Sequence, residues 1–234
     1  MAPVSPTVAR KSSKARAIGD DRARVTKQKS VKQARKPKNG LLDASIPHNA
    51  THLMELAQRN STQSPLLRLA PEIRNTIWEY AIGGSRIRVF SATYFDRPSK
   101  LSYWPFDPSG EPIMKSAFQL HKVCRQVYAE TAPLLYTLNM FSFYHVSDMD
   151  RWIKLRPIGQ LQLMTSIEVP FQYFSLYDRG LRTKFRKKFP NIKRISIQGT
   201  YTTIESRREE SKKRVVNMVK QREGEDVEVH VVWR

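Results

Sequence analysis

Five histidines and one cysteine are the side chains whose types and spacing could support catalysis or metal binding. His48 and His52 are four residues apart, as in a helical zinc site, but the segment between them lacks the glutamate that a zinc protease requires. His121 and Cys124 are three residues apart in a segment with helical periodicity. Because Cys124 falls in the apolar stripe of that segment, we interpret it as a buried structural thiol rather than a nucleophile or metal ligand.

Motifs of common enzyme families are missing from the sequence. It contains no glycine-rich phosphate loop, no GxSxG nucleophile motif and no paired-carboxylate pattern, and only 9 of its 234 residues are glycine. The single cysteine excludes an internal disulfide and a zinc site built from several cysteines. We therefore predict that the protein is not an enzyme, has no catalytic residues, binds no cofactor or metal, and takes no small-molecule substrate.

The charge of the chain favours an anionic partner. Lys and Arg number 41 against 21 Asp and Glu, a net charge of +20, which suits nucleic acid or an acidic protein surface. No stretch approaches the ~20 apolar residues of a membrane span, and no signal peptide is recognisable, so no membrane association is predicted. The basic segment 27–38 looks like a nuclear localisation cluster, and we expect the protein in the nucleus and/or the cytoplasm.

The aromatic residues divide the chain into a tail and a folded part. All 10 Phe, 4 Trp and 9 Tyr lie at or after Trp78. Residues 10–38 carry 12 Lys and Arg against two Asp, and such a segment repels itself and buries too little apolar area to fold. We predict a disordered basic tail over residues 1–63, with only a transient helical turn at 51–59, and a folded domain over residues 64–234.

Hydrophobic periodicity predicts alternating helices and strands in the folded part. Helices are expected at 71–82, 120–128, 134–136, 147–155, 181–189 and 202–221, and strands at 86–93, 141–145, 165–171, 192–198 and 226–233. The proline-rich stretch 94–116 is expected to be an irregular loop.

This alternation predicts an α/β fold, with α+β as the alternative, whose helix–strand units form a mostly parallel sheet. The segment around 189–198 resembles one leucine-rich-repeat strand, so we expect the sheet to be irregular and similar to that of such repeats. The helix at 71–82 is apolar on most sides. We expect its Ile73 and Ile77 face to be buried against the helices of 120–136, and the alternative is exposure of this face for docking.

A second basic segment, 179–222, is a candidate nucleic-acid interface. It carries 15 Lys and Arg against three Glu, and three aromatic residues that could stack on bases, Tyr173, Phe174 and Tyr177, precede it. The candidate nucleic-acid-binding residues are Arg182, Lys184, Arg186, Lys187 and Lys188. The alternative is a solvated helix carrying the i, i+4 pairs Glu209–Lys213 and Glu210–Arg214.

Two blocks of sequence resemble a fungal family of domains of unknown function that is usually described as F-box-like. They are SPLLRLAPEIRNTIWEYAIG at 64–83 and LHKVCRQVYAETAPLLYTLNMFSF at 120–143, and the resemblance covers roughly residues 65–234. Most of the matching positions are expected to be structural. Arg125 and Glu130 are the polar exceptions, and we expect them to anchor the second block through charge-assisted hydrogen bonds.

The resemblance implies a protein-interaction module. F-box proteins use an LPxEI helix to dock on the adaptor subunit of an SCF ubiquitin ligase, which makes that subunit the implied partner. Carried over to this sequence, the partner-binding residues are Leu69, Pro71, Glu72, Ile73, Ile77 and Trp78. The alternative function is a basic nucleic-acid-associated protein that binds mainly through the tail and the 179–222 segment.

Overall fold

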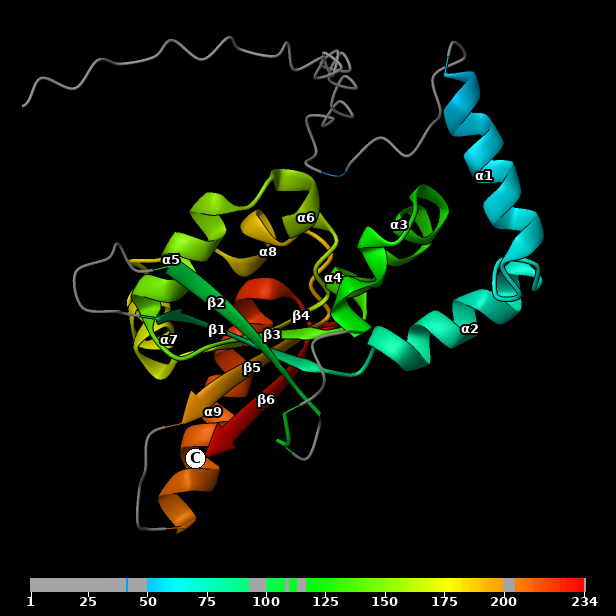
Figure 1. The fold of residues 1–234 in the computed structure, drawn as a ribbon. Coiled ribbons are helices and arrows are strands. Elements are labelled where there is room, and N and C mark those ends of the chain that lie inside the picture. Colours follow the sequence, from blue (N-terminus) through cyan, green and yellow to red (C-terminus); the bar gives the residue numbers. More distant parts are fainter. Residues whose placement is uncertain are drawn as a thin grey trace, which may run out of the picture. The chain divides into compact units, whose positions relative to one another are not determined.

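The computed structural model describes residues 41, 50–92, 100–107, 110–112, 117–199 and 205–233 (Figure 1). Most of the predicted tail lies outside these residues, but its last part is helical. Helix α1 (Thr51–Gln63) places the half-buried Leu53, Leu56 and Ala57 along a groove shared with residues 123–126. Regular secondary structure in the described residues therefore begins at Thr51, within the segment that was predicted to be tail.

Six strands form one sheet in the order β2-β1-β3-β4-β5-β6. The strands are β1 (Arg86–Ala92), β2 (Lys100–Phe106), β3 (Met140–Phe143), β4 (Ser166–Val169), β5 (Arg194–Gly199) and β6 (Glu228–Trp233). All neighbours pair in parallel except β2, which pairs antiparallel with β1. The predicted α/β class with a mostly parallel sheet is confirmed.

Strand β2 is a correction, because the sequence predicted an irregular loop over 94–116. The prolines of that stretch argued against a strand, but Pro105 is tolerated in β2 because this strand lies at the edge of the sheet. Leu101, in the same strand, is buried in the core. Residues 93–99, 108–109 and 113–116 lie outside the described residues.

Helices follow the parallel strands. They are α5 (Val146–Leu155), α6 (Ile158–Gln162), α7 (Phe171–Asp178), α8 (Phe185–Lys188) and α9 (Glu205–Glu223). Because consecutive parallel strands are also neighbours in the sheet, right-handed crossovers place their helices on one face. None of the described helices is long and apolar enough to cross a membrane.

The main core lies between that face and the helices. Phe141, Ile167 and Ile195 point from neighbouring strands into one cluster, and Trp152 of α5 and Tyr177 of α7 pack in the same cluster. Residues between these positions point to the opposite face, where Glu168 is completely buried. A carboxylate at that depth requires hydrogen-bond or ion-pair partners. Strand alternation thus gives the sheet one apolar face and one face that carries a row of buried polar side chains.

The buried polar row centres on the Glu168 carboxylate. Its Oε2 lies 2.9 Å from Arg86 Nε of β1, and its Oε1 accepts a hydrogen bond of 3.0 Å from Gln198 Nε2 of β5. Ser142 and Ser196, which flank Glu168 on β3 and β5, are also buried. These contacts join β1, β4 and β5 through side chains as well as through the backbone ladder.

The predicted helix at 120–128 is in fact two elements. A 3-10 helix, η1 (Ala117–Lys122), is followed by α3 (Arg125–Thr131), and Cys124 between them has an extended backbone. The Cys124 carbonyl begins the new helix by accepting a hydrogen bond from Tyr128 N. A continuous helix would have kept Val123 on the apolar stripe, whereas the break leaves it exposed. The short helix that follows, α4 (Leu134–Thr137), agrees with the prediction.

The predicted basic helix at 181–189 is another correction. Only the four residues of α8 are helical there, and α7, which was not predicted, precedes them. Gly180 ends the α7 segment with φ 75°, a left-handed conformation that favours glycine. The aromatic side chains that the sequence analysis assigned to a stacking surface instead form the buried face of α7.

Candidate partner-binding surface

Helix α2 (Pro71–Ile82) carries most of the residues predicted to bind a partner. Pro71 occupies its first turn, where the missing N–H costs no hydrogen bond, and Glu72 lies at the positive end of the helix dipole. The helix therefore begins where the sequence predicted. It packs against η1 and α4 (Figure 1).

The inward face of α2 differs from the predicted one. Arg74, Trp78 and Ile82 are buried, with Trp78 only 2% exposed, whereas Ile73 is 53% exposed and Ile77 is half-buried. The buried set at 74, 78 and 82 and the predicted set at 73 and 77 both have the spacing of one helix face. Trp78 buries the larger apolar area and Arg74 finds a carboxylate partner, so the 74/78/82 face turns inward. The predicted burial of the Ile73 and Ile77 face is therefore wrong for Ile73.

The Glu130 carboxylate holds this inward face in place. Glu130 Oε1 accepts a hydrogen bond of 2.7 Å from Arg74 Nη2, and Glu130 Oε2 accepts one of 2.8 Å from Trp78 Nε1. Gln126 adds a further donor to Glu130 Oε1 at 3.2 Å. Burial alone would raise the pKa of the Glu130 carboxyl, but these hydrogen bonds and the Arg74 charge outweigh burial and lower it. The predicted anchoring role of Glu130 is confirmed.

A small apolar cluster completes the packing of α2. Leu67, Trp78 and Val127 form its buried centre. The half-buried side chains around them are Leu66, Ile77, Leu120, Cys124 and Leu134. Cys124 thus contributes to a structural cluster, in agreement with its interpretation as a packing residue.

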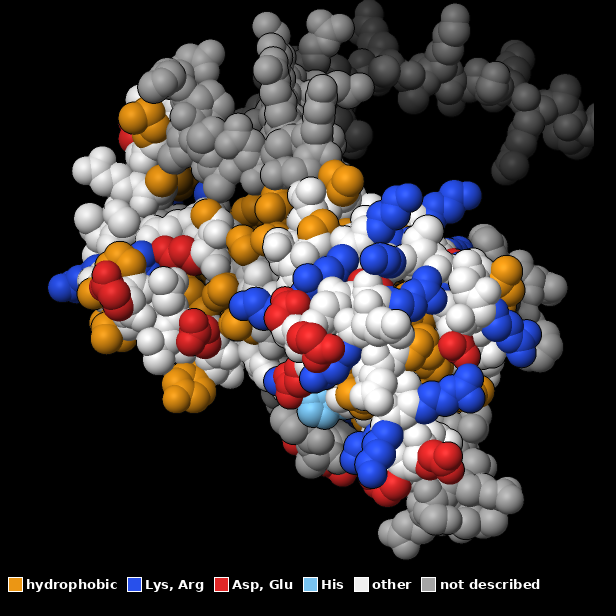
Figure 2. All heavy atoms as spheres, turned by 180° about the vertical axis from the view of Figure 1, so that it is seen from behind, with side chains coloured by type: hydrophobic (Ala, Val, Ile, Leu, Met, Phe, Trp, Pro, Cys, Tyr) orange, Lys and Arg blue, Asp and Glu red, His pale blue; other side chains and the backbone are white. Residues whose placement is uncertain are grey.

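The opposite face of α2 is exposed and partly apolar. We call Ile73, Thr76 and Tyr80 the α2 outer face; they lie at i, i+3 and i+7, and Tyr80 is 87% exposed. Leu69, just before the helix, is exposed as well. Seen from behind, hydrophobic side chains reach the surface on the side of the molecule where α2 lies (Figure 2).

The six predicted partner-binding residues therefore separate into two groups. The exposed group is Leu69, Pro71, Glu72 and Ile73, while Trp78 is buried and Ile77 half-buried. Tyr80 and Thr76 complete the exposed surface, but the sequence analysis did not select them. The helical spacing of Thr76 and Tyr80 from Ile73 was the sequence signal that could have placed them on the same face.

The predicted nucleic-acid-binding residues also differ in their contacts and exposure. Arg182 forms a two-pronged ion pair with Asp150, with both N–O distances 2.8 Å, and Arg186 pairs with Asp226. Lys184 and Lys187 are exposed and Lys188 is half-buried. On the face of the molecule shown in Figure 2, Lys and Arg side chains are interspersed with acidic side chains.

Two further predictions about the basic segment are corrected. Tyr173, Phe174 and Tyr177 are buried in the core, so they offer no stacking surface for bases. On α9, Glu209 lies 3.7 Å from Lys212 at i, i+3, and Arg214 lies 3.8 Å from Asp178 of α7. Glu209 thus pairs with Lys212 instead of the predicted Lys213. Residues three apart are neighbours on a helix surface, as residues four apart are.

Glu223, at the end of α9, is a structural centre that the sequence analysis missed. Its Oε1 accepts hydrogen bonds from the Tyr177 hydroxyl (2.6 Å) and from Phe185 N (2.8 Å). Its Oε2 accepts a hydrogen bond from Arg186 N at 3.0 Å. Burial and the bond to Glu223 raise the pKa of the Tyr177 hydroxyl. A glutamate near the end of a charged helix gives no sequence signal for such a role.

The histidines and the cysteine do not gather into a site within the described residues. His52 lies exposed on α1, whereas His48 falls outside the described part of the chain. Burial and the neighbouring Lys122 charge lower the pKa of the half-buried His121 imidazole. No group of three or more His, Cys, Asp or Glu that could hold a metal ion occurs among the described residues.

Comparison with known proteins identifies the family to which the chain belongs. The comparisons with curated proteins and with solved structures returned no match. A family model described as a domain of unknown function (DUF7730) matches residues 59–196, a range that includes α2, the Glu130 anchor, strands β1 to β4 and the beginning of β5. Since the match covers more than half of the chain, the protein belongs to the DUF7730 family of domains of unknown function.

Proposed function

We propose that the protein is a non-enzymatic protein-interaction module that docks a partner on the α2 outer face. The observation that carries this proposal is the combination of exposure and anchoring within one helix. Ile73 and Tyr80 are exposed, while Arg74 and Trp78 are fixed by the Glu130 carboxylate. A docking helix needs both properties, because a preorganised backbone reduces the entropy lost on binding.

The types of the exposed side chains support binding to a protein. Single apolar residues are normal on protein surfaces, but Ile73 and Tyr80 share one helix face and Leu69 lies just before it. Tyrosine is enriched among the residues that dominate binding energy, because its large rigid ring loses little entropy when it is buried.

We propose the adaptor subunit of an SCF ubiquitin ligase as the partner. The resemblance of residues 64–83 to the LPxEI helix of F-box-like domains supports this choice, and so does the exposure of Pro71 and Glu72 within the matching segment. In this role the protein would work in the nucleus and/or the cytoplasm, and it would hold a substrate through the α/β part.

The test is direct binding between the purified full-length chain and the purified adaptor subunit. An Ile73→Ala/Tyr80→Ala double variant should lose about tenfold or more in affinity, because two exposed anchors are removed. Its control is an Ile158→Ala/Tyr144→Ala variant, which removes the same two residue types from exposed positions on other elements. The control variant should bind like the wild type.

Both variants should also melt like the wild type, because each removes only exposed side chains. An adaptor subunit that fails to bind the wild-type chain would overturn the choice of partner. Equal binding by both double variants would show that the α2 outer face is not the docking surface.

A further inference from the structure

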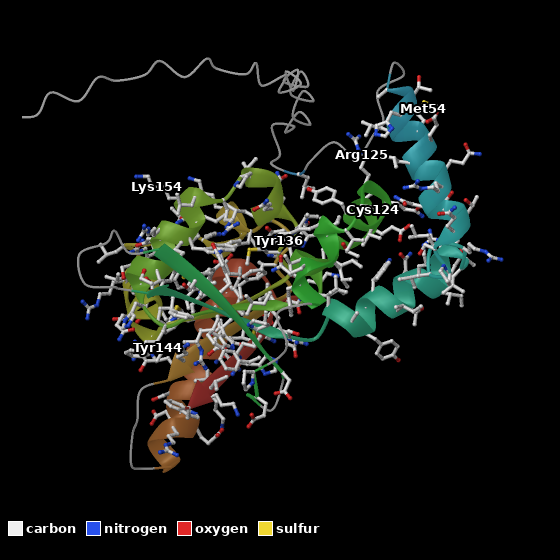
Figure 3. All side chains as sticks on the ribbon, in the orientation of Figure 1. Met54, Cys124, Arg125, Tyr136, Tyr144 and Lys154 are labelled. Atoms are coloured by element: carbon white, nitrogen blue, oxygen red, sulfur yellow. The ribbon has the colours of Figure 1, made fainter. Side chains whose placement is uncertain are left out.

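A cavity of about 390 Å3 lies between strands β1, β2 and β3 and the helices η1, α4 and α5, and the proposed docking function does not use it. Its volume is within the range of small-molecule sites, roughly 300–1,000 Å3. The cavity lies beside the main core, and the core residues Ile87, Phe141 and Trp152 contribute to its walls. Figure 3 shows Tyr136, another wall residue, between α4 and the strands.

The apolar wall of the cavity is built from aromatic rings. The Phe141 ring stacks on Tyr136, with the ring centroids 5.7 Å apart and the planes 11° from parallel. Phe141 also contacts Trp152 at a centroid distance of 5.2 Å, with the planes 42° apart. These ring contacts make this part of the lining apolar.

The polar part of the cavity is dominated by one cation. The Arg156 guanidinium carbon lies 5.2 Å from the ring centroid of Tyr103 and 5.2 Å from that of Trp152, and its Nη2 donates a hydrogen bond to the Tyr103 hydroxyl. Among the described residues, no Asp or Glu forms an ion pair with Arg156, and the described lining of the cavity contains no carboxylate. This positive charge is therefore not balanced within the described cavity.

Neighbouring polar groups add no further charge to the cavity. The Trp152 indole N–H is buried and has no hydrogen-bond partner among the described residues, and the same is true of Arg156 Nε. Burial raises the pKa of the Tyr136 hydroxyl, so it stays protonated at neutral pH. Burial and the Lys122 charge lower the pKa of His121, which keeps its imidazole uncharged there.

We propose that this cavity binds a small planar aromatic carboxylate. Because aromatic rings favour stacked or edge-on contacts, the aromatic ring of the ligand would lie against Tyr103, the most exposed aromatic ring of the described lining, and its carboxylate would accept hydrogen bonds from the Arg156 guanidinium. Arginine and carboxylate match in geometry and charge, and the low polarity of the surrounding walls strengthens the contact. The carboxylate would also neutralise a guanidinium that has no described carboxylate partner. The site binds a ligand and requires no chemical step.

The test compares naphthoate with the uncharged, equally shaped naphthamide by titration calorimetry on the full-length chain. Naphthoate should bind with a dissociation constant below about 1 mM, and naphthamide about tenfold more weakly. Arg156→Gln should remove this tenfold preference, while leaving naphthamide binding unchanged. The matched control is Lys154→Gln, which removes an exposed positive charge from α5, the helix that Arg156 follows (Figure 3), and should keep the preference.

Three results would overturn the proposal. They are the absence of naphthoate binding to the wild type, equal binding of naphthoate and naphthamide, and an equal loss of preference in the Arg156→Gln and Lys154→Gln variants. The comparison of the two ligands on the wild type needs no substitution, so the test remains decisive even if Arg156→Gln does not fold. Adaptor binding to the α2 outer face is a separate readout, so the two proposals can fail independently.

Discussion

Arg74 and Glu130, which are 56 residues apart in the chain, form a two-pronged ion pair that fixes α2 against α3. Nη2 and Nε of Arg74 lie 2.7 and 3.2 Å from the two carboxylate oxygens, and the Trp78 indole donates to the same carboxylate. The two blocks of the sequence resemblance thus meet at one carboxylate. The pair determines which face of α2 is buried and which is exposed.

Removing the Glu130 carboxylate should destabilise the protein, because the buried Arg74 charge would lose its partner. Breaking a buried pair costs about 3–5 kcal/mol, and we expect Glu130→Ala to fall near 3 kcal/mol because the Glu130 side chain is still 19% exposed. Urea unfolding of the full-length chain measures the effect. Glu79→Ala, which removes an exposed carboxylate of α2, is the control and should change stability by less than about 0.5 kcal/mol. Similar urea midpoints for Glu130→Ala and Glu79→Ala would contradict the stabilising role assigned to Glu130.

The same pair predicts a pH dependence of stability. The pKa of Glu130 in the folded protein is below its ordinary value of 4.5, so folding favours the ionised form. Its contribution should be complete above pH 4.5 and should be lost as the pH falls through the lowered value. The difference in free energy of unfolding between the wild type and Glu130→Gln should therefore narrow from neutral to acid pH. A constant difference would show that the ion pair does not stabilise the fold.

The sequence predicted α2 but not its orientation. Periodicity gives the length of a helix and the spacing of its apolar residues, and both the Ile73 and Ile77 set and the Arg74 and Trp78 set satisfy that spacing. The choice between them depends on Glu130, which only the folded chain brings close. For this reason the sequence predicted the helix correctly but included the buried Trp78 among the residues expected to bind a partner.

The cavity could not be predicted from the sequence. Its walls come from β1, β2, β3, η1, α4 and α5, and the β2 stretch was predicted to be a loop. Arg156 follows an ordinary amphipathic helix and has no motif around it. The parallel sheet, by contrast, was predictable, because each strand has its own apolar alternation and each crossover its own helical period.

Glu223 should stabilise the junction of α7, α8 and α9. Glu223→Ala would leave the Phe185 and Arg186 N–H groups and the Tyr177 hydroxyl without their acceptor, at a cost of about 3 kcal/mol. Amide hydrogen exchange at Phe185 and Arg186 should accelerate in this variant. Glu225→Ala removes a nearby exposed carboxylate and should leave both readouts unchanged. Unchanged exchange at Phe185 and Arg186 in Glu223→Ala would contradict the stabilising role assigned to Glu223.

The alternative function, binding to nucleic acid through the basic segment, predicts a specific salt dependence. Lys184 and Lys187 are the exposed cations of the predicted set, whereas Arg182 and Arg186 form ion pairs with Asp150 and Asp226. If the two lysines contact phosphates of duplex DNA, Lys184→Gln/Lys187→Gln should reduce the slope of log affinity against log salt by about 2.

The control for this test changes the net charge by the same amount at another place. Lys122→Gln/Lys154→Gln removes two exposed lysines from η1 and α5, so a local phosphate contact predicts an unchanged slope for it. Filter binding with the full-length chain at several salt concentrations measures both slopes, and the residues outside the described structure contribute equally to each variant. If the two double variants lower the slope equally, the attraction follows the net charge of the chain and the 179–222 segment is not an interface. If only Lys184→Gln/Lys187→Gln lowers it, this segment contacts the phosphates even though its neighbouring aromatic residues are buried.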